Sequence, residues 1–225
     1  MNPSGPPEFI VFGGTFNPVH SGHLAVARQL AGLPWASLLF IVPAALSPFK
    51  RDRDHLPPDL RLRMAREAFS GLPRTCVLDW EIRRPPPSYT LDTAIAMRHA
   101  FPRARLWLAI GSDVLASFAE WHGAGRILEY AGLIVFPRAM EADAHRPQSS
   151  PEVCLPPPWN KNLTWDAQDQ LVHPDGRPIV RRIPLQAPLL SASRIAQERD
   201  LAQVPPGARE LLAEYWSQSA APSAP

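Results

Sequence analysis

His20 and His23 stand three residues apart in the stretch GGTFNPVHSGHL, which runs from Gly13 to Leu24. An imidazole can donate hydrogen bonds, carry a positive charge near neutral pH or bind a metal. If both residues fall in the first turn of a helix, their side chains are neighbours, and Gly22 leaves space beside them. Backbone N–H groups of such a loop and helix start attract anions. The pattern therefore indicates a phosphate site.

Two other interpretations fit the same residues. Two glycines followed by Asn17 and Pro18 are typical of a turn. A His-x-x-His pair is also half of many metal sites, although the missing third ligand disfavours zinc. On these residues alone, the phosphate site, the turn and the metal pair all stay open. Because a third ligand is missing, we expect no metal site formed by the protein itself.

Short apolar runs alternate with helix-type patterns along most of the chain. The runs show no strict alternation, which is typical of strands buried on both faces of a parallel sheet. They lie at 9–12, 38–42, 76–80, 106–110 and 133–136. Between them, apolar residues recur every three or four positions at 24–31, 60–69, 91–100 and 126–130. This succession predicts an α/β protein with a Rossmann-like, doubly wound parallel sheet and flanking helices.

The alternation stops in a polar, proline-rich stretch between about 138 and 178. We interpret it as an insertion that ends in a hairpin whose turn is HPDG at 173–176. A last strand at 179–185, a helix capped by Ser191 or Ser193, and a C-terminal helix that begins with proline follow. We expect a single domain over 1–216 and a disordered tail over 217–225.

Composition excludes several classes of protein. A chain of 225 residues that is 45% hydrophobic and 20% charged is typical of a folded globular protein. Its net charge of +2 and scattered arginines give no reason to expect nucleic acid or an anionic membrane as a partner. Cys76 and Cys154 form no CxxC pair, and neither a leader nor a membrane span is evident. We therefore expect a cytoplasmic protein.

The opening stretch resembles the signature of the HxGH nucleotidyltransferase superfamily, and in particular bacterial-type nicotinate/nicotinamide mononucleotide adenylyltransferases. The likeness continues in order through SPFK, RLRMA, RRPPPSYTLDTA, IGSD, FAEWH and LLSASRI. PSYTLDT and the tryptophan after IGSD narrow it to the pyridine-nucleotide branch. The resemblance implies the HxGH nucleotidyltransferase fold and a reaction of NAD biosynthesis. AMP would pass from ATP, with Mg²⁺, to the phosphate of a pyridine mononucleotide, giving the dinucleotide and pyrophosphate.

The resemblance also implies roles for individual residues. The catalytic residues would be His20, His23 and Lys50. ATP would be bound by Gly13, Gly14, Thr15, Phe16, Gly22, Gly111, Asp113, Ser191 and Ser193. The mononucleotide would be bound by Asn17, Ser88, Tyr89, Thr90 and Trp121. Three of these residues also have simpler interpretations, as a solvated lysine for Lys50, a helix N-cap for Asp113 and a core aromatic for Trp121.

Two positions depart from the pattern of the resembled family, and both concern phosphate binding. Phe49 stands where that family has histidine, and Ala196 where it has arginine. An arginine–phosphate contact contributes ~1.5 to 3 kcal/mol, so its loss would weaken ATP binding or turnover about ten- to a hundredfold. Of the two nearby arginines, Arg199 lies closer in helical direction to Ala196 than Arg194 does, so we predict that Arg199 binds ATP instead.

Arg61 fits either a phosphate contact or an ion on a helix surface, and we leave it out of the predicted site. Two alternative functions also stay open. The departures at Phe49 and Ala196 suit a non-catalytic or weakly active nucleotide-binding paralogue, which ligands would stabilise without turnover. Another HxGH transferase, acting on phosphopantetheine or forming a CTP-linked product, would leave PSYTLDT unexplained. The sequence distinguishes neither the acid from the amide mononucleotide nor a monomer from a homo-oligomer.

Overall fold

The computed structural model describes residues 5–46, 55–137, 154–185, 188 and 190–219. Within these ranges eight strands form one sheet, in the order β3-β2-β1-β4-β5-β8-β7-β6. The strands are β1 (Glu8–Gly14), β2 (Ala36–Pro43), β3 (Thr75–Val77), β4 (Arg105–Gly111), β5 (Ala131–Phe136), β6 (Thr164–Trp165), β7 (Gln170–Val172) and β8 (Pro178–Arg182). Pairing is parallel from β3 to β8 and antiparallel for β7 and β6. The predicted α/β class is confirmed, with an antiparallel hairpin added at one edge.

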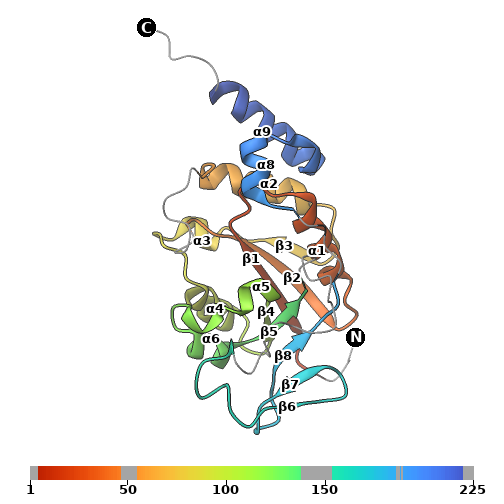
Figure 1. The fold of residues 1–225 in the computed structure, drawn as a ribbon, viewed down its shortest axis with the longest axis vertical. Helices are drawn as coiled ribbons and strands as arrows, with labels where there is room; N and C mark the ends of the chain where they lie inside the picture. The colour runs from red at the N-terminus through yellow and green to blue at the C-terminus, as the bar shows by residue number, and fades with distance from the viewer. Residues whose placement is uncertain (1–4, 47–54, 138–153, 186–187, 189, 220–225) are drawn as a thin grey trace.

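Helices lie on both faces of the sheet (Figure 1). One face is covered by α1 (Ser21–Gly32), α2 (Pro58–Phe69), α8 (Ala192–Glu198) and α9 (Pro206–Ser219). The other is covered by α4 (Thr90–Ala100), α5 (Ser112–Leu115), η1 (Phe118–Glu120) and α6 (Ala124–Tyr130). Two short elements, α3 (Trp80–Arg83) and η2 (Leu201–Gln203), complete the connections. In the described ranges, none of the helices has the length and apolar character that a membrane crossing needs.

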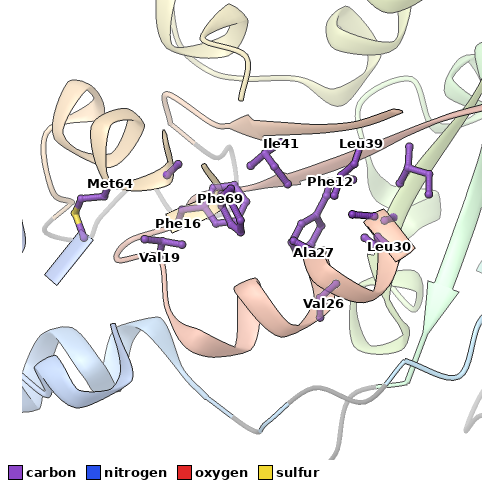
Figure 2. Packing of buried hydrophobic residues seen from close by; sticks show 14 of the residues in the cluster. Phe12, Phe16, Val19, Val26, Ala27, Leu30, Leu39, Ile41, Met64 and Phe69 are labelled. Atoms are coloured by element: carbon purple, nitrogen blue, oxygen red, sulfur yellow. The ribbon is translucent and has the colours of Figure 1, made fainter. Parts of the chain in front are cut away.

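The sheet separates two hydrophobic layers. Successive residues of β1 alternate between them, since Ile10 and Phe12 pack toward α1 whereas Phe9 and Val11 pack toward α4. This alternation with burial on both sides explains why the strands read as unbroken apolar runs. Figure 2 shows the first layer, in which Phe12 of β1 faces Ala27 of α1.

Several predicted boundaries differ from the structure. The third strand ends at Val77 and a helix begins at Trp80, so the predicted run 76–80 covers two elements. The third strand, β3, lies at the edge of the sheet and pairs only with β2. Backbone hydrogen bonds on one side alone stabilise a longer strand less than bonds on both sides would. The last strand ends at Arg182 rather than 185.

The C-terminal helix extends to Ser219, so residues 217–219 of the expected tail are helical. The Oγ atoms of Ser217 and Ser219 donate to the carbonyl oxygens of Glu214 and Tyr215, at 2.7 and 2.9 Å. Residues 220–225 lie outside the described residues.

The hairpin expected at the end of the insertion is confirmed. Between β7 and β8, the N–H of Gly176 donates to the carbonyl of His173 at 2.8 Å, and Gly176 adopts a φ of 82° that favours glycine. Upstream, the indole of the buried Trp159 donates to the carbonyl of Gly125 in α6 at 2.8 Å. The described part of the insertion is therefore packed against the body of the protein; residues 138–153 lie outside the described residues.

Candidate active site

Two adjoining cavities open beyond the carboxyl ends of β1 and β4, where the strand order reverses. Ligands of open α/β sheets bind at such a switch point. The larger cavity has a volume of about 1060 Å³ and the smaller about 170 Å³. They share part of their walls, formed by Gly13, Gly14, Thr15, Ala109, Ile110 and Trp121. Gly13 and Gly14 end β1 itself, so the predicted loop begins two residues later than expected.

The two histidines form a stacked pair at the start of α1 and line the larger cavity. His20 is the N-cap residue, and its Nδ1 accepts from the backbone N–H of His23 at 3.3 Å. In return, the Nδ1 of His23 accepts from the backbone N–H of His20, also at 3.3 Å. The ring centroids lie 3.6 Å apart, with 23° between the planes. His20 is buried, with 3% of its surface exposed.

This reciprocal bonding decides where each neutral ring keeps its proton. An Nδ1 that accepts a hydrogen bond carries no proton, so in the neutral ring the proton is on Nε2. Each imidazole therefore carries an N–H donor at Nε2, the ring nitrogen farther from the backbone. Two cations stacked this closely would repel each other. The geometry favours a pair of hydrogen-bond donors over a pair of imidazolium ions.

Gly22 and Phe16 support the histidine pair. A Cβ on Gly22 would lie 3.0 Å from Nδ1 of His20 and 3.2 Å from the carbonyl oxygen of Pro188. Phe16 is 1% exposed, and its ring meets that of His23 edge to face at a centroid distance of 4.9 Å. Phe16 lines the larger cavity, as predicted for an ATP-binding residue, but its packing marks it as a core residue that fixes His23.

A methyl group at Gly22 is expected to disturb the histidine pair without unfolding the protein. Gly22→Ala should displace the His20 ring and lower turnover about tenfold, because catalysis by positioned donors is sensitive to small shifts. Gly32→Ala, at the other end of α1, is the matched control, since a Cβ there meets nothing within 4 Å. Turnover and thermal melting of both variants test this expectation. Equal activity of the two variants would contradict it.

Arg61 holds together the loops beneath the cavities. Its side chain is fully buried and donates to the carbonyls of Thr15 and Ala44 from Nη1, Ala45 from Nη2 and Leu56 from Nε, at 2.6 to 3.0 Å. Burial lowers the pKa of Arg61 to about 10, so the guanidinium is charged at neutral pH. Arg61 is thus neither a phosphate contact nor a surface ion, and both interpretations from the sequence were wrong.

The remaining predicted ATP-binding residues lie on several elements. Gly111 and Asp113 line the larger cavity. Asp113 belongs to the first turn of α5 and Gly111 is the N-cap, so the N-cap interpretation of Asp113 was wrong. Ser193 of α8 lines the cavity, whereas Ser191 is the N-cap of α8 and accepts from the N–H of Arg194 at 3.3 Å. Asn17 also lines this larger cavity, and its Oδ1 accepts from the N–H of Leu56 at 2.8 Å.

The predicted replacement of the missing arginine is not supported by the geometry. Ala196 lines the larger cavity, but Arg199 ends α8 in a left-handed conformation, with its guanidinium 5.7 Å from the ring centroid of Trp216. Arg194 pairs with Glu198 at 2.8 Å. Among the described residues that line this cavity, none is lysine or arginine. Lys50 and Phe49 lie outside the described residues.

The smaller cavity gathers four of the five predicted mononucleotide-binding residues, whereas the fifth, Asn17, lines the larger cavity. Ser88, Tyr89, Thr90 and Trp121 line it, and Thr90 is the first residue of α4. The rings of Tyr89 and His122 lie 4.3 Å apart at 31°. Trp121 is half-buried and borders both cavities, so it is not simply a core residue.

Among the cavity residues that were not predicted from the sequence, four carry imidazole, carboxyl or amide groups. His55 and Gln197 line the larger cavity, and Glu81 and His122 line the smaller. His122 adjoins Trp121 in the quoted motif FAEWH, and this adjacency is the signal that could have indicated it. Glu81 lies in α3, directly after the run predicted as a strand at 76–80, and it is 8% exposed. Its buried contacts come from the fold and leave no mark in its immediate sequence.

Several known proteins are similar to this chain. A probable nicotinate-nucleotide adenylyltransferase of Bacteroides fragilis is 36% identical over 128 residues, which are 57% of this chain and 64% of that protein. One of Pseudomonas syringae pv. tomato is 38% identical over 140 residues, 62% of each protein. The matched part of the chain thus spans less than two thirds of these relatives' length.

The fold is shared with a solved structure, Plasmodium falciparum nicotinic acid mononucleotide adenylyltransferase complexed with NaAD. The TM-score is 0.68 over 93% of this chain and 96% of that one, at 13% sequence identity. The model of the cytidylyltransferase-like family matches residues 11–170, which include the end of β1, the histidine pair and most of the lining of both cavities. Since this match covers well over half of its length, the protein belongs to the cytidylyltransferase-like family.

Proposed function

We propose that the protein is an adenylyltransferase of NAD biosynthesis that transfers AMP from ATP to nicotinate or nicotinamide mononucleotide. The observation that carries this proposal is the pair of cavities that share the wall at Gly13–Thr15, with the histidine pair lining the larger one. The names of the curated relatives support the choice of reaction.

Each cavity suits one substrate. The larger one has room for a nucleotide and is bordered by the starts of α1 and α8, where backbone N–H groups favour phosphates. Asp113 lines the same cavity and would hydrogen-bond a ribose. The smaller cavity is lined by Tyr89 and Trp121, whose rings suit an aromatic base. The shared wall is where the two phosphates would meet.

The reaction needs positioning more than covalent chemistry. A phosphate oxygen of the mononucleotide would form a bond to the α-phosphorus of ATP, and the bond to the bridging oxygen of pyrophosphate would break. The nucleophile is already an anion, so no covalent enzyme intermediate is required. His20 and His23 would donate from Nε2 to oxygens on which charge develops.

Mg²⁺ would enter with ATP, and when bound it would neutralise charge on the phosphates. Asp113 is the sole carboxylate among the described residues that line the larger cavity. The described ranges also contain no group of three or more histidine, cysteine or carboxylate side chains placed to hold a metal ion. This donor set fits a cation held mainly by substrate phosphates, as Mg²⁺ commonly is.

One assay with several arms tests the proposal. The protein is incubated with ATP and Mg²⁺ and with nicotinate or nicotinamide mononucleotide, and pyrophosphate and dinucleotide are measured. Product with either mononucleotide is expected. Thermal stabilisation by the ligands without product would favour the non-catalytic paralogue, to which Ala196 points. Product only with phosphopantetheine, or with CTP and an alcohol phosphate, would assign a different transferase.

The arginines of α8 are expected to be dispensable for ATP binding. Replacing both Arg194 and Arg199 with alanine should leave the KM for ATP within about twofold, because neither is among the described residues that line the cavity. Ala196→Arg should instead lower that KM about tenfold by adding a cation to the wall. Steady-state kinetics measure both effects. A clear rise of KM in the double variant would restore Arg199 to the site.

We further propose that residues 1–216 form one nucleotidyltransferase domain that acts in the cytoplasm. The single sheet from β3 to β6 supports one domain. Cys76 and Cys154 are both free thiols, which fits a reducing compartment.

A further inference from the structure

Glu81 is a buried acid in the wall of the smaller cavity. Its side chain belongs to α3, and the residue is 8% exposed. Of the described residues that line this cavity, Glu81 alone carries a carboxylate, and none is lysine or arginine. The predicted roles in adenylyl transfer do not use this group.

One hydroxyl group holds the Glu81 carboxyl group as a hydrogen-bond acceptor. The Oγ1 of Thr93 accepts from Nη2 of Arg84 at 2.6 Å and donates to Oε1 of Glu81 at 2.6 Å. A hydroxyl has one proton to donate, and the proton of Thr93 is directed to Glu81. Ser88, whose Oγ accepts from the N–H of Ala45 at 3.0 Å, lines the same cavity.

A hydrogen bond donated to a carboxylate favours the anion. Burial raises the pKa of Glu81 above its ordinary value, and the bond from Thr93, the charge of Arg84 and the nearby Ser88 hydroxyl limit this rise. Asp92, the other charged group that acts on Glu81, is exposed and does not line the cavity. Arg84 is also outside the lining, so the charge presented to the cavity is negative.

We propose that Glu81 is the counterion of the positively charged pyridinium ring and that it selects substrates by ring charge. This inference rests on the proposed function, which places the ring in the smaller cavity. In a pyridine mononucleotide the ring nitrogen is bonded to the ribose and carries a permanent positive charge. A buried carboxylate attracts that charge far more strongly than it would in water. The aromatic walls at Tyr89 and Trp121 also attract a cationic ring, so the contribution of Glu81 is the part of the preference that Glu81→Gln removes.

Binding measurements with two matched ligands test this assignment. One ligand is nicotinamide mononucleotide, and the other is its C-nucleoside isostere, in which carbon replaces the ring nitrogen and removes the charge. By calorimetry, the wild-type protein is expected to bind the charged ring about tenfold more tightly. Glu81→Gln, which keeps the shape of the side chain, should reduce this preference to about twofold or less. Asp92→Asn removes a charge next to Thr93 and should leave the preference unchanged.

Each outcome supports or overturns the assignment. Equal binding of the two ligands to the wild-type protein would overturn it, as would an equal loss of affinity for both in Glu81→Gln. If Glu81→Gln fails to fold, Glu81→Asp keeps the charge and should keep the preference; loss of the preference there counts against the proposal. Absence of turnover in the wild-type protein would refute the proposed function alone, since the binding preference is measured without turnover. Failure of both ligands to bind would overturn both proposals.

Discussion

Replacing His20 with alanine is expected to lower kcat for dinucleotide formation at least about a hundredfold. A preorganised donor to developing charge contributes on the order of 3 kcal/mol to the barrier. The stacked rings of His20 and His23 hold their Nε2 donors in a fixed arrangement, so the loss of one ring also releases the other. Alanine also removes the N-cap of α1, at a cost of roughly 1 kcal/mol in stability.

His20→Asn separates these two effects. Asparagine is a good N-cap and keeps an acceptor for the N–H of His23, but it has no group that reproduces the Nε2 donor. We expect a melting temperature close to that of the wild-type protein and the same large loss of kcat. Single-turnover kinetics and thermal melting measure the two properties. Retention of kcat within about threefold in His20→Asn would remove His20 from the catalytic machinery.

Replacing Arg61 with methionine is expected to destabilise the protein by about 3 to 5 kcal/mol. Four carbonyl groups would lose their donor inside the protein, and each unsatisfied buried group costs about 1–3 kcal/mol before relaxation. Denaturant unfolding gives the change in the free energy of unfolding. Both loops that carry these carbonyls border the cavities, so ligand binding should weaken as well.

Two further variants calibrate the Arg61 prediction. Arg63 lies on the same helix at an exposed position. Arg63→Met is expected to change the free energy of unfolding by no more than about 0.5 kcal/mol. Arg61→Lys retains a charge but lacks the planar fork that reaches four carbonyls, so it should lose most of the stability that methionine loses. A fully stable Arg61→Met would show that water replaces the guanidinium.

Elements governed by local patterns could be predicted from the sequence. The strands of the parallel core are predicted by apolar runs, and the helices that cover them by helical spacing of apolar residues. Each of these patterns lies within a single element, so it can be recognised without knowledge of the tertiary contacts. The histidine pair could be predicted for the same reason, because the start of α1 and the two rings lie within four residues. The gathering of Ser88, Tyr89 and Trp121 at the smaller cavity followed from the family resemblance.

Features that depend on tertiary contacts could not be predicted. Arg61 bonds to loops up to 46 residues away, so nothing next to it shows that it is buried. Arg199 was predicted on helical direction, but α8 ends at that residue, where φ is 52° and the side chain turns toward Trp216. Glu81 follows the predicted strand at 76–80, and its contact with Thr93, twelve residues away, leaves no local signal. In each case a distant partner decides where the side chain lies.

The sheet divides the core into two layers, and the two cavities are lined by elements of these layers in different proportions. The larger cavity is bordered by α1 and α8 of one layer and by α5 of the other, and the smaller by α3 and α4, of which α4 packs into that second layer. The linings of the two cavities are therefore largely separate, and they meet at the ends of β1 and β4 and at Trp121. Changes to residues that line only one cavity are therefore expected to leave most of the other cavity intact.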